Sequence, residues 1–402
     1  MPKLPNGAHL SRRARWAIPA GAVVIAGAVT AGSMISVAQA SPELPAKTPA
    51  QLLAAVAGHS GPPPALTGTV VETASLGIPQ LPGSGDPMSI TSLLSGSHTI
   101  KVWYGNPAHL RLAVPVQMGE TDLIRNGTSA WVWQSNANSV THITLPAKST
   151  SAGSAPQLPQ TPLTPQQAAK QALAAAGPST TVSVDRNVSV AGQAAYQLVL
   201  APKDGRSLIG RVSIALDAAK NVPLRVQVFA KGAKAPAFQV GYTSISFVKP
   251  AAANFTFKAP AGAKIQQATL PGSMPNGWTG QSPAQAKQAS KQFQVIGKDW
   301  TSVAVLPASA LSALSGSGSA ASAAGHAAQS AAGNSAYSSS GSGDSAALAA
   351  GLLKAATPVH GTWGSGRLLH TSLISMLITD NGHVLVGAVT PSVLYSAAAH
   401  VK

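Results

Sequence analysis

The 402-residue chain contains no cysteine, only 9% of its residues are charged, and only 4% are aromatic. Without cysteine the protein is neither a disulfide scaffold nor a lipoprotein that is acylated at a cysteine after its signal. The small share of charged residues leaves much of the contact with water to Ser, Thr, Gln and Asn. Acidic side chains are the scarcest charged group, because 11 of them stand against 27 lysines and arginines.

The sequence also lacks the short patterns that mark common catalytic and metal sites. Its 10 histidines are dispersed without a His-x3-His spacing, and no GxSxG pattern of a hydrolase occurs. No Gly-rich run is followed by Lys-Ser or Lys-Thr, as in a phosphate-binding loop. The close acidic pair Glu120 and Asp122 shares one strand face and is typical of a solvated strand edge. We therefore expect a protein that is not an enzyme and that holds no metal ion or cofactor.

The first 40 residues have the pattern of an export signal. Arg12, Arg13 and Arg15 precede an apolar run from Trp16 to Ala38, and Ala38-Gln39-Ala40 supplies the small residues that a signal peptidase needs. The apolar run is also about as long as the roughly 20 residues of a membrane helix. We therefore expect an extracytoplasmic protein, either secreted or tethered to the outer face of the cytoplasmic membrane.

The excess of basic residues persists after the export segment is removed. Cleavage takes away Lys3, Arg12, Arg13 and Arg15, which leaves 23 basic against 11 acidic residues and a net charge of +12. This charge suits an anionic membrane surface or acidic envelope polymers, although a solubilising surface charge explains it equally well. The bases are scattered singly, so nucleic acid is not an expected partner.

Two segments are predicted to be helical. PAQLLAAVAGH begins at Pro49, a residue suited to the first helical turn, and is rich in Ala and Leu. In the second segment Thr164 is a capping residue, Pro165 takes the first helical position, QQAAKQALAAA is a strong helix former, and Gly177 ends the helix.

Most of the remaining chain up to residue 260 alternates between apolar and polar residues. HLRLAVPV (109–116), LIGRVSIALD (208–217) and LRVQVF (224–229) each place their aliphatic residues on one strand face. Further strand candidates are 67–75, 99–104, 122–125, 130–134, 140–145, 182–190, 195–200, 238–248 and 255–257. One-sided strands are typical of an antiparallel sheet. Two helices cannot cover so many apolar faces by ordinary layering, so the sheet must close on itself or curl around something.

Composition divides the chain into five regions. They are the export segment 1–40, a main domain 41–270, a connector with one strand 271–310, a Ser/Ala/Gly-rich flexible linker 311–346, and a small C-terminal β module 347–402.

Two of these regions carry further expectations. We expect WTSVAVLP (300–307) to pair with a hairpin that HTSLISMLIT and HVLVGAVT form around Asn381-Gly382. In the main domain a long loop, 76–97, separates the first two strands. This loop is either a plain insertion or an apolar flap that carries Leu93 and Leu94.

Five stretches, taken in order, resemble the LolA/RseB superfamily of periplasmic lipoprotein carriers and their lipid-binding relatives. They are IKVWYGNPAHLRL, DLIRNGTSAWVWQSN, RVSIALDAAKNVPLRVQVF, FQVGYTSISF and AANFTFKAPAGAKI, and with the first helix they span residues 49–265. The long loop 76–97 and the C-terminal extension depart from the carriers. The C-terminal strands are similar to the small C-terminal domain of RseB-type proteins.

The resemblance implies a mainly β (α+β) fold, in which an unclosed antiparallel β half-barrel carries a helical lid and a cavity for acyl chains, with a small C-terminal β element. The candidate wall residues are Leu110, Leu112, Val114, Trp131, Trp133, Val212, Ile214, Leu216, Val226 and Val228. The candidate lid residues are Leu52, Leu53 and Leu173, and the candidate flap residues are Leu93 and Leu94. Trp131 and Trp133 follow an Asn-Gly hairpin turn and share one strand face, which either lines the cavity or packs as ordinary core.

The expected function is that of a non-enzymatic binding protein that holds the acyl chains of a lipid or lipoprotein. An RseB-like envelope-stress sensor, which binds a membrane protein partner, is the alternative. Both expectations depend on the resemblance and on the apolar strand faces together.

Overall fold

The computed structural model describes residues 42–57, 62–77, 95–116, 118–145, 164–174, 177–269, 294–307 and 355–401. The predicted export segment 1–40, most of loop 76–97 and the linker 311–346 lie outside these ranges. Residues Ser41–Lys402 group into one compact unit. Within the described ranges, no helix is both long enough and apolar enough to cross a bilayer.

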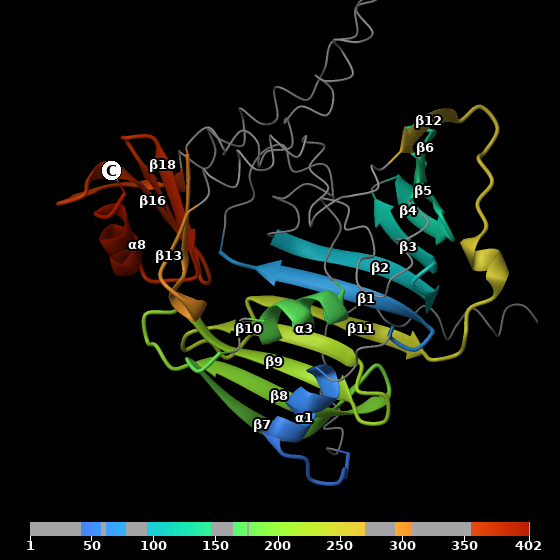
Figure 1. Ribbon diagram of the computed structural model, residues 1–402, viewed down its shortest axis with the longest axis horizontal. Helices are drawn as coiled ribbons and strands as arrows, with labels where there is room; N and C mark the ends of the chain where they lie inside the picture. The colour runs from blue at the N-terminus through green and yellow to red at the C-terminus, as the bar shows by residue number, and fades with distance from the viewer. Residues whose placement is uncertain are drawn as a thin grey trace, which may run out of the picture. The chain divides into compact units, whose positions relative to one another are not determined.

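Most of the described chain forms one open sheet. Its strands are β1 (Leu66–Ser75), β2 (Ser95–Asn106), β3 (His109–Val116), β4 (Gly119–Asn126), β5 (Ser129–Gln134), β6 (Ser139–Thr144), β7 (Thr180–Val190), β8 (Gln193–Pro202), β9 (Ile209–Asp217), β10 (Pro223–Ala230), β11 (Phe238–Ser246) and β12 (Lys264–Thr269). Their order is β12-β6-β5-β4-β3-β2-β1-β11-β10-β9-β8-β7 (Figure 1). The fold is therefore mainly β, as the alternating pattern predicts.

The sheet is mixed, so the expectation of a purely antiparallel sheet is wrong at one edge. Strand β12 pairs with β6 in parallel, whereas the other neighbours are antiparallel. A parallel pair requires a connection that crosses the sheet. Residues 247–263 make that crossing, and we call them the crossing segment. Its 3-10 helix η3 (Ala252–Phe255) contacts β3 and β4 on the way to β12.

The crossing segment corrects a second expectation, because residues 255–257 do not form a strand. Two side chains hydrogen-bond to the local backbone here: Asn254 Nδ2 donates to the Ala251 carbonyl and Thr256 Oγ1 to the Ala253 carbonyl. Such local bonds compete with strand pairing. Phe255 is buried and its ring lies 5.6 Å from that of His109, centre to centre.

Both predicted helices are present and begin where expected. Helix α1 (Pro49–Ala57) starts with a capping box, in which Thr48 Oγ1 accepts from the Gln51 amide and Gln51 Oε1 accepts from the Thr48 amide. Helix α3 (Pro165–Ala174) repeats this arrangement with Thr164 and Gln167. Helix α3 packs on β10 and β11 and α1 contacts β7, as Figure 1 shows.

Strand β9 is buried more completely than its alternation predicts. Val212, Ile214 and Leu216 are at most 2% exposed, but Ser213 and Asp217 on the other face are also only 3% exposed. Asp217 is buried because it organises the following turn, where its Oδ1 accepts hydrogen bonds from the Ala219 and Lys220 amides. A polar residue in an alternating pattern therefore does not by itself indicate a solvated face.

The C-terminal residues form a second, six-stranded antiparallel sheet in the order β13-β14-β18-β17-β16-β15. The elements are β13 (Gln294–Ile296), η4 (Asp299–Thr301), β14 (Val303–Pro307), β15 (Thr357–Gly361), β16 (Gly364–His370), β17 (Ser375–Thr379), β18 (His383–Gly387) and α8 (Pro391–Ala398). The expected pairing of β14 with a hairpin around Asn381-Gly382 is confirmed. The sheet is larger than predicted, because β15, β16 and α8 lacked a clear sequence pattern.

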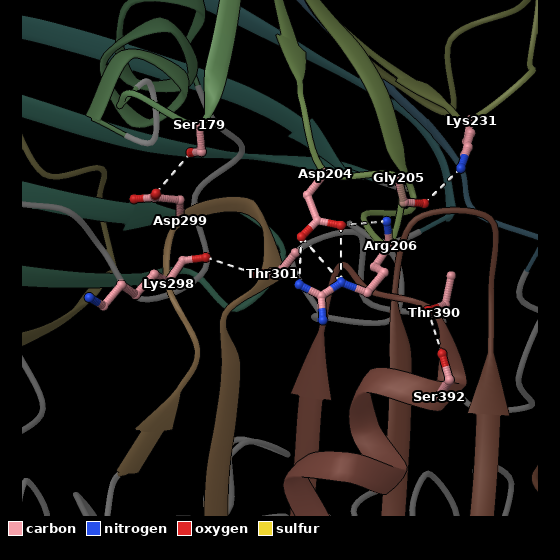
Figure 2. Close-up of polar contacts among 10 residues, drawn as sticks. All are labelled: Ser179, Asp204, Gly205, Arg206, Lys231, Lys298, Asp299, Thr301, Thr390 and Ser392. Carbon is pink, nitrogen blue, oxygen red and sulfur yellow. Dashed lines mark hydrogen bonds and ion pairs between the residues drawn. The ribbon is translucent and has the colours of Figure 1, made fainter.

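Several hydrogen bonds join the second sheet to loops of the first. Ser179 Oγ donates to Asp299 Oδ2 over 2.8 Å, and the Thr390 amide donates to the Arg206 carbonyl over 2.9 Å. Figure 2 shows Arg206 beside Asp204, with a shortest separation of 2.7 Å between the guanidinium and the carboxylate. Hydrogen bonds from Arg206 lower the pKa of Asp204 to about 2. The two sheets therefore meet through specific polar contacts.

Candidate functional site

The apolar face of the large sheet gathers most of the predicted wall residues. Val114, Val212, Ile214, Leu216 and Val226 belong to one buried cluster, and Leu112 and Val228 pack against it. Cross-strand pairing explains this grouping, because Val226, Ile214 and Leu198 face each other directly across β10, β9 and β8. Leu110 shares this face of β3 with Leu112 and is 8% exposed, but it lies outside the cluster.

The two helices bring the predicted lid residues to the same cluster. Leu52 of α1 is fully buried in it, and Leu53 and Leu173 pack against it. We call this side of the sheet the lid face. The wall side chains are therefore closed off by the helices rather than open to water, and an apolar ligand reaches them only if a helix moves.

One hydrogen bond ties helix α3 to the sheet. Gln166 Nε2 donates to the Tyr242 hydroxyl over 3.1 Å. Tyr242 is 4% exposed, and burial raises its pKa to about 12. The phenol therefore stays neutral at physiological pH, and the contact is a neutral hydrogen bond worth about 1 kcal/mol. No sequence pattern indicates this contact, because Tyr242 fits the pattern of an ordinary strand residue.

Three acidic or basic residues interrupt the aliphatic wall. Arg125 of β4 lies directly opposite Leu110 and is 2% exposed. Glu72 of β1 and His98 of β2 lie directly opposite each other and are 3% and 8% exposed. They continue the row of alternating residues that contains Val70 and Ile100, so the strand period places them on the lid face. The two-residue period of the strands is therefore the sequence pattern that indicates the position of Glu72 and His98 on the lid face.

Trp131 and Trp133 lie on the opposite face, so they do not share the lid face with the other predicted wall residues. Strands β3 to β6 pair without a shift, and the row Leu112, Leu123 and Val132 belongs to the lid face. The tryptophans alternate with Val132 and therefore point away from the lid. They contact a different set of rings.

The rings on this second face come from β6 and the crossing segment. Trp131 stacks on His142 at 5.3 Å, and the Phe257 ring lies 6.1 Å from Trp131 and 6.4 Å from Trp133. The half-buried tryptophans thus pack against these rings beneath the crossing segment, as the interpretation of this pattern as packing predicts.

The second face also buries an ion pair. Arg111 Nη2 lies 2.5 Å from Asp122 Oδ2 and 3.9 Å from Glu120 Oε1. Burial raises the pKa of Asp122 to about 6, and the Arg111 guanidinium opposes that shift. Asp122 is 3% exposed, so the expectation of a solvated acidic pair is wrong for this residue. Its Oδ1 and the Arg111 Nε have no hydrogen-bond partner among the described residues.

An open pocket of about 260 Å³ lies where the N-terminal residues pass the edge of the sheet. We call residues 42–48 the N-terminal strap. The pocket lies between this strap and strands β7 and β8, and its lining includes Leu44, Lys47, Val184, Arg186, Asn187 and Tyr196. No local sequence pattern indicates these residues, because the pocket depends on a contact between segments about 150 positions apart, such as Pro45 and Tyr196.

The predicted flap residues and possible metal ligands remain to be placed. Leu93 and Leu94, the predicted flap, lie outside the described residues. Within the described part of the chain, no three His, Asp or Glu side chains come together closely enough to hold a metal ion.

The chain is similar to known proteins in structure and not in sequence. No known family model matches the sequence, and no curated protein matches it. The structural matches include MucB and LolA superfamily proteins, which are distant by sequence. MucB in the MucA/MucB complex of Pseudomonas aeruginosa is 15% identical, with 87% of this chain and 96% of that chain covered and a TM-score of 0.37.

Shorter proteins match the chain over about half its length. A LolA superfamily protein from Nitrosomonas europaea is 11% identical, with 53% of this chain and 99% of that chain covered and a TM-score of 0.21. A putative outer membrane lipoprotein-sorting protein domain from Vibrio parahaemolyticus is 11% identical, with 49% and 90% covered and a TM-score of 0.17. With TM-scores this low, the matches carry no conclusion about ligand or partner.

Proposed function

We propose that the protein is an exported, non-enzymatic binding protein that holds the acyl chains of a lipid or lipoprotein between its lid helices and the lid face of its large sheet. The observation that carries this proposal is the burial of predicted wall and lid residues in one aliphatic cluster. Ile214 and Leu216 on the wall and Leu52 on the lid are all fully buried there. Within the described residues the lid consists of two short helices rather than a continuous layer.

The energetics of chain burial fit such a site. Each CH2 group removed from water contributes about 0.8 kcal/mol, so roughly a dozen of them contribute on the order of 10 kcal/mol. This attraction has no direction, and aliphatic walls meet it without a specific polar contact. A chain can replace lid contacts with contacts of the same kind once a helix moves.

The first test is native mass spectrometry of the full-length chain purified from a bacterial envelope without detergent. We expect a mass excess that resolves into extractable lipid. A ligand-free mass that persists after incubation with membrane lipids contradicts the proposal.

A matched pair of variants locates the ligand. Val226→Thr adds a hydroxyl to the lid face without changing the shape of the side chain, and we expect it to lower lipid occupancy. Val71→Thr makes the same change on the opposite face of β1 and serves as the control. Equal occupancy in both variants, with both folded, means that the lid face does not hold the chain.

A partner-binding sensor is the second candidate function, and the C-terminal sheet favours it. Strand β15 is the last strand in that sheet, and four of its five residues are exposed. An exposed edge offers unpaired amides and carbonyls to a strand from another protein. A photo-crosslinking residue at the exposed His360 of β15 should then capture a membrane protein in the envelope, whereas one at the exposed Lys234 should not.

A further inference from the structure

The open pocket beside the N-terminal strap belongs to the same face of the sheet as the aliphatic cluster. Leu44, Val184 and Tyr196 line the pocket and also contact or belong to that cluster. Val184 lies directly opposite Leu198, which is fully buried under the lid. The floor of the pocket is therefore continuous with the apolar wall.

A β-bulge shapes the rim of the pocket. The pairing of β7 with β8 shifts between Asp185 and Val188, so that Arg186 and Asn187 together stand opposite Tyr196. Bulges re-aim side chains and are enriched next to functional sites. The bulge places a basic residue and an amide beside the pocket at the outermost strand of the sheet.

The strap is held at this bulge by two hydrogen bonds to proline carbonyls. The Tyr196 hydroxyl donates to the Pro45 carbonyl over 2.8 Å, and Asn187 Nδ2 donates to the Pro42 carbonyl over 3.1 Å. The strap continues through the Thr48 cap directly into α1. A molecule that displaces the strap therefore also acts on the first lid helix.

The rim carries two basic side chains that suit an anion. Lys47 Nζ lies 4.7 Å above the centre of the Tyr196 ring, and Arg186 is exposed. None of the ion pairs among the described residues engages either of them. Asp185 also lines the pocket, and its carboxylate accepts hydrogen bonds from the Arg186 amide at Oδ1 and from Gln197 at Oδ2. These donors are neutral, so two basic side chains and one carboxylate line the pocket. Arginine and lysine together are well suited to a phosphate group.

The volume of the pocket suits a lipid head group better than a whole lipid. Its volume of about 260 Å³ lies below the range of about 300–1,000 Å³ that is typical of pockets for whole drug-sized ligands. It is large enough for a phosphate with a few attached atoms. Apolar side chains of the packed cluster continue from this floor toward Leu52 of α1, so the rest of an amphiphile has an apolar surface to follow once α1 moves.

We infer that this pocket is the entry site of the protein, where Lys47 and Arg186 bind the phosphate head group of an amphiphile while its acyl chain passes under the N-terminal strap to the lid face. This inference rests on the proposed function and adds a place and a head-group class to it. Tyr196 and Asn187 are positioning residues that hold the strap over the site.

The test compares two amphiphiles that share a chain and differ in a phosphate. The full-length protein is titrated calorimetrically with myristoyl lysophosphatidic acid and with monomyristoylglycerol, below their micelle concentrations and in phosphate-free buffer. We expect about tenfold tighter binding of the phosphate compound, as charge-assisted hydrogen bonds produce. The double variant Lys47→Gln/Arg186→Gln should lose this preference and keep its affinity for the neutral compound.

The control variant is Lys234→Gln/Lys249→Gln, which removes the same charge from exposed positions outside the pocket and should behave as the wild type. Equal affinity of the wild type for both compounds, or the same loss in the control variant, overturns the entry site and leaves the proposed function standing. Inorganic phosphate that competes as strongly as the amphiphile also overturns it, because the site then serves a free anion. If neither compound binds, the proposed function fails and the entry site fails with it.

Discussion

The two faces of the large sheet bury different chemistry, although alternate residues of the same strands build them. The lid face is aliphatic around Ile214 and Leu216 and is covered by helices at β7, β10 and β11. It also carries the buried Glu72, His98 and Arg125 on β1, β2 and β4. The second face carries the Arg111–Asp122 ion pair and the rings of Trp131 and Phe257, beneath the crossing segment. Aliphatic contacts have no preferred direction, whereas ion pairs and stacked rings require particular partners. This difference supports exchange of contents on the lid face and a fixed structural role for the second face.

The largest expected effect comes from removing aliphatic bulk on the lid face. Ile214→Ala leaves a cavity at a fully buried position and should lower the free energy of unfolding by about 2–5 kcal/mol. Urea denaturation measures this loss. The half-buried Val71 on the opposite face provides the control, and Val71→Ala should cost less than Ile214→Ala. Equal losses would mean that the two faces do not differ in how tightly they are packed at these positions.

The buried Asp122 on the second face should make the free energy of unfolding depend on pH. The folded pKa of Asp122, about 6, lies above its ordinary value of 3.8, so the folded state binds its proton more tightly than the unfolded state does. The contribution of Asp122 is therefore fully present below about pH 4 and is lost as pH rises through about 6, by at most about 3 kcal/mol. Asp122→Asn should remove this slope from the free energy of unfolding measured between pH 4 and 7.

Asp204 provides the control for this pH effect, because its pKa is shifted in the opposite direction. Its contribution is present above about pH 4 and is lost only as pH falls through about 2. Asp204→Asn should therefore leave the slope between pH 4 and 7 unchanged. An unchanged slope in Asp122→Asn would show that Asp122 does not titrate within this window, and the contrast between the two faces would lose its electrostatic part.

The sequence predicts the lid face much better than the second face, for a physical reason. Strand period and helix caps are local, so they correctly place Val212, Ile214 and Leu216 on one face and begin the helices at Pro49 and Pro165. The second face depends on the crossing segment, which returns over β3 and β4 from more than 100 residues away in sequence. Alternation assigns Trp131 and Trp133 to a common face, but it does not say which face the lid covers.

The same distinction applies to charged residues. Asp122 has the local pattern of a solvated edge residue. Its burial follows from the contact with Arg111 on the neighbouring strand β3 and from Trp133, which lies directly opposite it on β5. The sequence does not indicate the entry pocket for a similar reason, since the strap that completes the pocket is distant in sequence from β7 and β8. Local sequence patterns therefore locate the helices and strands and show which residues share a face. Segments that are distant in sequence decide which of those faces are buried.

The smallest expected effect comes from two substitutions that each loosen one of the two lid helices. Tyr242→Phe removes the hydrogen bond between β11 and Gln166 of α3, and Tyr196→Phe removes the bond that holds the strap before α1. Each change should lower stability by only about 1 kcal/mol, because both phenyl rings keep their packing. Amide hydrogen exchange should quicken in α3 for Tyr242→Phe and in α1 for Tyr196→Phe. If both variants quicken both helices equally, the lid moves as one body, and admission of a chain past α1 requires α3 to move as well.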